Sequence, residues 1–255
     1  MTALFDSHCH VDEEKFDQDR DAVLQRMAEN GVTRMAVVGS DMATSAHGVA
    51  FAAEHPGCVA VVGIHPHEAK GFREADLQHL ADWYTSGQAK AIGEIGLDYY
   101  WKEVPRDLQK EVFRAQLQLA KVLDLPVIVH DREAHADCLA IVREFPGVRG
   151  VFHCYSGSAE DAKTLVKLGW HLSFTGTITF KNARKAPEVI AAVPLERIMV
   201  ETDAPYMAPT PFRGKRCDSR YVYRMAETIA EIKGLTPAEV EQATTENGKA
   251  LFAIP

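Results

Sequence analysis

Short apolar segments, rich in β-branched residues, alternate with longer helical patterns along the whole chain. The apolar segments predict eight strands, at residues 3–6, 34–38, 58–63, 90–94, 126–130, 148–153, 171–174 and 197–201. Such an alternation normally gives parallel strands joined by right-handed helical crossovers. We therefore predict the α/β class and a (β/α)₈ TIM barrel, with an open doubly wound sheet as the alternative.

Several of the segments between the predicted strands carry helix signals. One helical face follows Pro105 and consists of Leu108, Val112, Ala115, Leu119 and Val122. Two helix starts are indicated by a capping residue with an acidic residue three positions later, at Ser158 with Asp161 and at Thr236-Pro237 with Glu239. The stretch from Pro205 to Gly214 is rich in Pro and Gly and predicts a long functional loop.

Length and composition favour one domain over residues 1–255, because 255 residues with 46% hydrophobic side chains can bury one large core. The five cysteines form no C-x-x-C pair, which argues against a disulfide framework or a zinc ribbon. The N-terminus lacks a signal sequence and no apolar run approaches 18 residues, so we expect a cytoplasmic monomer without membrane contact. A net charge of −8 argues against broad, nonspecific binding to nucleic acid.

Acidic and imidazole side chains stand at the ends of the predicted strands. They are His8 and His10, His65, Glu94, His130, His153 and Asp203. In a barrel the carboxyl ends of all strands meet at one face, where so many polar groups would destabilise the fold unless a cation neutralised them. We therefore predict a metal site at the C-terminal face, centred on Glu94, whose two carboxylate oxygens could touch two cations.

The other histidines, and the cysteines beside candidate ligands, are expected to have structural roles. His47, His55, His79 and His171 have no such neighbours in the sequence, which favours surface or packing roles for them. Cys9 and Cys154 lie beside candidate ligands, but no base is marked for either, so they are expected to fill space.

The strand-end motifs, taken in order, resemble the TatD family of metal-dependent deoxyribonucleases, within the amidohydrolase-like hydrolases. The resemblance covers nearly the whole chain and rests on Asp6-Ser7-His8-Cys9-His10, Gly63-Ile64-His65-Pro66-His67, Ile92-Gly93-Glu94-Ile95-Gly96-Leu97-Asp98-Tyr99-Tyr100, Pro126-Val127-Ile128-Val129-His130, His153-Cys154-Tyr155-Ser156-Gly157-Ser158 and Glu201-Thr202-Asp203-Ala204-Pro205-Tyr206. One departure is Cys217-Asp218-Ser219, where the family usually has Asn-Glu-Pro after its basic loop.

The resemblance implies which residues hold two divalent metal ions. His8, His10, Glu94 and Asp203 would surround one ion, and Glu94, His130 and His153 would hold the second, with Glu94 as the bridge. It also implies a substrate-facing His65 and phosphodiesterase activity, since some members are 3′–5′ exonucleases on single strands.

The expected chemistry is hydrolysis by a metal-bridging hydroxide, which needs no Ser or Cys nucleophile. Asp203 is placed to take the proton from the attacking water, and a simple ligand role is its alternative. Glu94 and His65 complete the expected catalytic set. Mg²⁺, Mn²⁺, Zn²⁺ and Co²⁺ all suit these ligands, so the identity of the metal stays open.

Two clusters are candidates for contacts with a single-stranded DNA substrate. Arg213, Lys215 and Arg216 follow the eighth strand and match phosphate geometry, although such a loop is often only a solvated patch. Tyr99 starts an aromatic cluster with Tyr100 and Trp101 that could stack on unpaired bases or pack in the core.

Two other functions compete with a deoxyribonuclease. The same metals could hydrolyse an ester or amide, for example as an aminoacyl-tRNA deacylase. The other is a metal-holding binding module without catalysis, which is distinguished from an enzyme by whether both metal sites and Asp203 are intact, and here every candidate ligand is present. The physiological substrate, the cleavage polarity and the native metal stay open.

Overall fold

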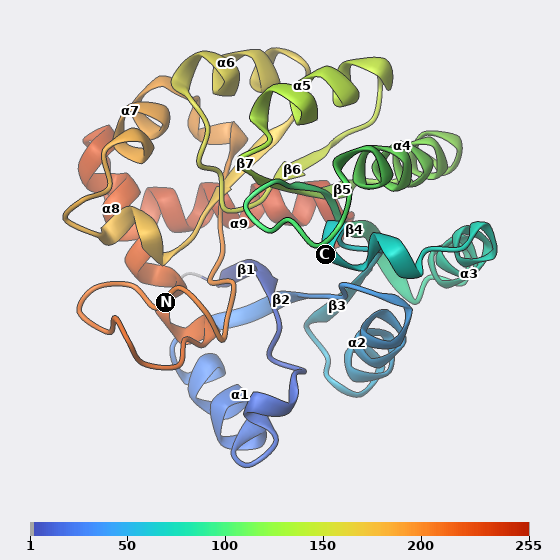
Figure 1. Cartoon of the computed structure of the whole chain (residues 1–255). Coiled ribbons are helices and arrows are strands. Elements are labelled where there is room, and N and C mark those ends of the chain that lie inside the picture. The colour runs from blue at the N-terminus through green and yellow to red at the C-terminus, as the bar shows by residue number, and fades with distance from the viewer. Residues whose placement is uncertain (1–2, 255) are drawn as a thin grey trace.

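The computed structural model describes residues 3–254, in which eight strands form one sheet, paired in chain order and all parallel (Figure 1). The strands are β1 (Leu4–Cys9), β2 (Val32–Val38), β3 (Cys58–Val62), β4 (Ala89–Asp98), β5 (Val127–Arg132), β6 (Gly150–Phe152), β7 (His171–Phe174) and β8 (Ile198–Val200). Each lies where the sequence predicted a strand.

Hydrogen bonds from the last strand region to the first close the sheet. The Ser7 hydroxyl donates to the Val200 carbonyl oxygen over 3.0 Å. Beyond the end of β8, the Asp203 N–H donates to the His8 carbonyl oxygen at 2.9 Å, and the His10 N–H donates to that of Ala204 at 2.7 Å. The predicted TIM barrel is therefore confirmed, and the open doubly wound sheet is wrong.

Helices follow the strands and surround the barrel (Figure 1). They are α1 (Arg20–Glu29), α2 (Met42–Glu54), α3 (Glu74–Thr85), α4 (Arg106–Leu123), α5 (His135–Glu144), α6 (Ala159–Lys167), α7 (Lys185–Ala192), α8 (Val222–Lys233) and α9 (Pro237–Phe252). Short 3₁₀ helices are η1 (Glu14–Phe16), η2 (Pro66–Gly71), η3 (Gly176–Thr179), η4 (Leu195–Arg197) and η5 (Ser219–Tyr221).

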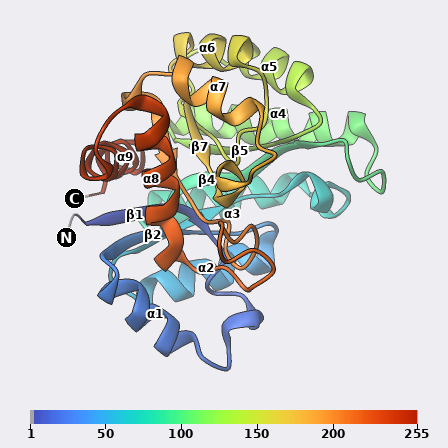
Figure 2. The ribbon, with the colours of Figure 1, turned by 90° about the vertical axis from the view of Figure 1, so that its left-hand side faces the viewer.

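Side chains that alternate along the strands make two separate apolar layers. In β2, Val37 packs in the layer between sheet and helices, whereas Val38 belongs to the cluster inside the barrel. The end of α9 closes this inner cluster, since the Phe252 ring meets the Phe5 ring edge-on at 5.6 Å. Figure 2 shows α9 beside both chain termini. The end of α9 therefore fills the barrel interior at the end opposite the carboxyl ends of the strands.

The helix after Pro105 forms as predicted, and its buried face is only partly the predicted one. Val112 is buried and Leu108 and Leu119 are half-buried against the core, but Val122 is 70% exposed, and Phe113 and Leu117 are buried in addition. The buried face also includes two glutamines, which apolar periodicity could not indicate. Gln116 donates to the Ile64 carbonyl oxygen (3.0 Å) and accepts from the Ile64 N–H (2.8 Å), so its burial satisfies two loop backbone groups.

The predicted helix starts at Ser158 and Thr236 are confirmed. The Ser158 hydroxyl accepts from the Asp161 N–H at 3.1 Å. Thr236 and Glu239 form a reciprocal capping box at the start of α9. These caps fix where the two helices leave the preceding loops.

The long loop after β8 is also present and extends further than predicted, because residues 201–218 contain neither helix nor strand. Cys217-Asp218-Ser219 ends this loop, where Cys217 is buried and the Asp218 carboxylate accepts from the Arg220 N–H at the start of η5. Within residues 3–254 no helix is both long and apolar enough to cross a membrane, and the five cysteines are free.

Candidate metal centre

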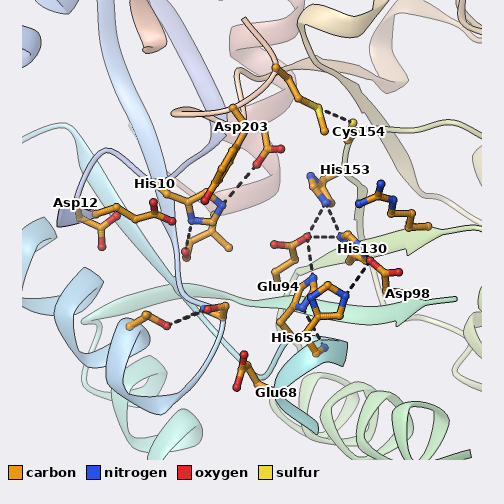
Figure 3. Close-up of a pocket in the computed structure, with 18 of the residues that line it drawn as sticks. His10, Asp12, His65, Glu68, Glu94, Asp98, His130, His153, Cys154 and Asp203 are labelled. Carbon is orange, nitrogen blue, oxygen red and sulfur yellow. Dashed lines mark hydrogen bonds and ion pairs between the residues drawn. The ribbon is translucent and has the colours of Figure 1, made fainter. Parts of the chain in front are cut away.

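The strand-end side chains predicted from the sequence meet at one cleft on the C-terminal face of the barrel. The cleft has a volume of about 1290 Å³, and among its lining residues are His10, His65, Glu94, His130, His153 and Asp203. His8 lies beneath them and is fully buried. Figure 3 shows Glu94 between His10 and Asp203 on one side and His130 and His153 on the other.

The backbone of β4 turns the Glu94 side chain into this cleft. Glu94 lies inside the strand and not at its predicted end, since β4 continues to Asp98. The pairing of β4 with β5 is irregular between Ile92 and Ile95, and the Glu94 N–H instead donates to the Gly39 carbonyl oxygen at 3.0 Å. Gly96 then permits close approach to β5, because a Cβ there would lie 2.0 Å from the His130 carbonyl oxygen.

One group of candidate ligands surrounds the Oε2 atom of Glu94. His8 Nε2 lies 3.6 Å from this oxygen and 3.7 Å from Asp203 Oδ1. His10 Nε2 lies 3.5 Å from the same Asp203 oxygen and 3.2 Å from His8 Nε2. The His10 Nδ1–H donates to the Val38 carbonyl oxygen at 2.8 Å, which leaves the Nε2 lone pair facing the cleft.

A second group surrounds the other oxygen of Glu94. His130 Nδ1 and His153 Nε2 each lie 2.6 Å from Glu94 Oε1, and 3.1 Å from each other. The outer nitrogens of both rings point to buried carboxylates. His130 Nε2 lies 3.0 Å from Asp98 Oδ2. His153 Nδ1 lies 3.3 Å from Glu201 Oε1.

The first group has the spacing that a bound cation requires. Four ligand atoms about 2.1 Å from a cation would lie about 3.4 Å apart in a tetrahedron, close to the 3.2–3.7 Å separations found here. Without a cation, nitrogens and carboxylate oxygens at these distances would be poorly satisfied in a buried site. The imidazole and carboxylate donors therefore fit a divalent metal ion.

The charge balance in both groups also favours a cation. Burial lowers the pKa of His153, but the negative charge of Glu94 and Glu201 outweighs burial and raises this pKa well above its usual range. Burial likewise lowers the pKa of His10, but Asp203 and Glu94 raise it to about 9. The carboxylates thus draw positive charge into the cleft, and a metal ion would compete with these protons.

His65 faces the same cleft in a different way. Its Nδ1 accepts a hydrogen bond from the His67 N–H at 3.1 Å, so the proton of a neutral ring is on Nε2. Nε2 lies 3.8 Å from Glu94 Oε1. Burial lowers the pKa of His65 well below its usual range, which keeps the ring neutral. His65 therefore presents an N–H donor to the cleft.

Four other predicted substrate contacts, Arg213, Lys215, Arg216 and Tyr99, lie outside this cleft. Arg216 bonds to both carboxylate oxygens of Asp19, with a shortest distance of 2.7 Å. The Arg213 guanidinium lies 4.1 Å from the centre of the Phe180 ring. Tyr99 donates from its hydroxyl to Asp137 at 2.6 Å. None of these residues, nor the exposed Lys215, lines the cleft.

Several residues at the site carried no assigned role in the sequence. Asp98 and Glu201 are two of them, although both stand inside recognised motifs, Gly96-Leu97-Asp98 and Glu201-Thr202-Asp203. Lys15 and Arg132 are the lysine and arginine residues that line the cleft within residues 3–254. They are far apart in the sequence and in no shared pattern, so only the fold brings them together.

Known proteins that are similar to this chain match it over nearly its whole length. The sequence profile described as TatD-related DNase matches residues 5–253. The chain is 43% identical over 253 residues to YabD of Bacillus subtilis, named an uncharacterized metal-dependent hydrolase, with 98% of this chain and 99% of YabD covered. It is 32% identical to the 3′-5′ ssDNA/RNA exonuclease TatD of Cronobacter sakazakii, with 98% of this chain and 97% of that protein covered.

A solved structure supports the comparison. The crystal structure of YjjV, a TatD homologue from Escherichia coli K12, superposes with a TM-score of 0.92 at 32% identity, and 99% of each chain is covered. The similarity therefore extends to the barrel as a whole.

Proposed function

Because this chain belongs to the TatD-related DNase family and is a metal-dependent hydrolase, we propose that it cleaves phosphodiester bonds in single-stranded DNA. The observation that carries this proposal is the position of Glu94. One of its oxygens faces His130 and His153, and the other faces His8. A carboxylate in this position suits two neighbouring cations, the arrangement that phosphodiester hydrolysis commonly uses.

The residues have distinct proposed roles. His8, His10, Glu94 and Asp203 would hold one divalent ion, and Glu94, His130 and His153 would hold the other. When bound, the two ions would lower the pKa of a water molecule and neutralise charge on the phosphoryl oxygens. Asp203 lines the cleft, and its carboxylate would orient the attacking water and accept its proton. His65 would donate its Nε2–H to a substrate oxygen.

The lining of the cleft favours an unpaired strand as substrate. Trp101 and Tyr206 line it with 47% and 46% of their surface exposed, which leaves ring surface for unstacked bases. Lys15 and Arg132, which line the cleft, would contact phosphates. A relative of this chain is named a 3′-5′ ssDNA/RNA exonuclease, and we propose 3′–5′ polarity here by analogy.

The test uses metal-reconstituted protein with end-labelled single-stranded DNA, duplex DNA, RNA and aminoacyl-tRNA, each with an EDTA control. A 3′–5′ exonuclease shortens 5′-labelled strands to a ladder and releases the label of 3′-labelled strands as a mononucleotide. Cleavage of RNA in preference to DNA would change the proposed substrate. Free amino acid from aminoacyl-tRNA, with intact nucleic acid, would replace the nuclease by an ester hydrolase.

A further inference from the structure

The two halves of the candidate metal centre differ in what supports their histidines. We propose that Asp98 and Glu201 position His130 and His153. As a result, the half made of Glu94, His130 and His153 binds its cation more tightly than the half made of His8, His10, Glu94 and Asp203, and it fills first. This inference rests on the proposed metal centre but not on the nucleic-acid substrate.

Asp98 holds His130 from a rigid position. Its side chain is 1% exposed, and Oδ2 accepts from His130 Nε2 at 3.0 Å. Oδ1 accepts from the N–H groups of Tyr100 (3.0 Å) and Trp101 (3.2 Å). The Gln109 side chain fixes the Asp98 backbone through two hydrogen bonds. The carboxylate therefore cannot turn away, and His130 keeps Nδ1 directed at Glu94.

Glu201 has the same relation to His153. It is fully buried, and Oε1 accepts from the Cys154 N–H at 2.7 Å and lies 3.3 Å from His153 Nδ1. Oε2 accepts from the Ser173 hydroxyl. Each contact orients the carboxylate, which fixes the tautomer that leaves His153 Nε2 free for a metal. A carboxylate behind a ligating imidazole also makes that imidazole a better donor.

The other half lacks such support. His10 Nδ1 donates to a neutral carbonyl oxygen, that of Val38. His8 Nδ1 is buried without a hydrogen-bond partner in the described part of the chain. Asp203 adds a negative charge there at the cleft, but neither His8 nor His10 has a carboxylate at its outer ring nitrogen. The supported half should therefore hold its ion more firmly than the unsupported half.

Stepwise titration of the metal-free protein with Zn²⁺ or Co²⁺, measured by calorimetry, tests this difference. The wild type should bind one ion tightly and a second more weakly. Asp98→Asn and Glu201→Gln keep shape but lose charge, and each should weaken the tight step about 10–100-fold while the weak step changes little. His10→Asn should remove the weak step and keep the tight one, which assigns the steps to the two halves.

Asp131→Asn is the matched control, since Asp131 follows His130 directly in β5 but bonds to His135 Nδ1 at 2.8 Å and to no candidate ligand among the described residues. It should leave both steps unchanged. Two equal sites in the wild type, or equal weakening of both steps by Glu201→Gln and Asp98→Asn, would overturn the inference. Thermal unfolding of each variant separates loss of fold from loss of metal. Failure to cleave nucleic acid would leave these binding results standing.

Discussion

The backbone N–H of Asp203 donates to the carbonyl oxygen of His8 across 2.9 Å, and this bond joins the region after the last strand to the first strand. The same bond sets two candidate ligands side by side, with His8 Nε2 3.7 Å from Asp203 Oδ1. Thr202 is fixed as well, because its N–H donates to Asp6 Oδ1 at 2.9 Å. The contacts that close the barrel therefore also place two of the candidate metal ligands side by side.

Asp203→Asn should retain the fold and the ion at Glu94, His130 and His153, because asparagine keeps the shape and one oxygen donor. Turnover should fall about 10²–10⁴-fold through loss of the proton acceptor. The measurement is kcat at saturating metal, so that occupancy of the first half does not explain the change. Turnover near that of the wild type would show that another group accepts the proton, and His65 would be tested next.

Glu94→Ala should remove metal from both halves, because its two oxygens serve both groups of histidines and two uncompensated cations would repel each other. Elemental analysis after dialysis measures the metal content per chain. Glu68→Ala is the control, since Glu68 lines the same cleft while Figure 3 shows its carboxylate apart from the candidate ligands. Two ions per chain in the Glu94 variant would contradict the bridging role.

Lys15→Ala and Arg132→Ala should each raise KM for an oligonucleotide and reduce the salt slope of binding by about 1, as expected for one lost phosphate contact. Arg132 sits with its guanidinium 4.0 Å from the Tyr100 ring centre, and Lys15 lies 4.2 Å from that of Tyr206. Both cations are thus held beside rings that could meet bases. Metal content is the control measurement for Arg132, which follows His130 closely in β5.

The matched comparison for these variants is Arg213→Ala with Lys215→Ala, in the loop that the sequence indicated as a phosphate contact. Both residues are exposed and neither lines the cleft, so KM and its salt slope should change less than in the cleft variants. Arg216 is left in place because it pairs with Asp19. A larger effect in the loop variant would show that the loop, and not Lys15 and Arg132, makes the main phosphate contact.

His171→Gln should reduce the loss of stability in acid. Burial, with a smaller effect of Arg197, lowers the pKa of His171 from its ordinary 6.5 to about 4. The unfolded chain therefore takes up a proton first, and the stability present above pH 6.5 is lost as pH falls toward 4. Between pH 6.5 and 4, the wild type should lose about 1–3 kcal/mol more of its free energy of unfolding than the variant does.

Urea unfolding in EDTA at both ends of that pH range measures the effect and removes metal linkage. His79→Gln, on the exposed side of α3, should leave the pH dependence unchanged. Identical slopes in the His171 variant and the wild type would show that His171 does not contribute to acid unfolding.

Much of this protein follows from local patterns. Alternating apolar and amphipathic segments determine parallel strands with helical crossovers, and the carboxyl ends of such strands must meet at one face. For that reason the sequence places His10, Glu94, His130 and Asp203 in one group, although they are separated by dozens of residues. The caps at Ser158 and Thr236 are predictable in the same way, because a cap depends only on residues within one helical turn.

Other features depend on contacts that no local pattern encodes. The buried face of α4 includes Gln109 and Gln116 because backbone groups of distant loops need partners, and a polar residue gives no apolar signal. Arg216 turns toward Asp19 and away from the cleft because an ion pair forms across a long sequence separation. Asp98 and Glu201 gain their places behind His130 and His153 in the same way. The sequence alone determined which strand ends meet, since periodicity is local, whereas the partner of each side chain was decided only when the barrel closed.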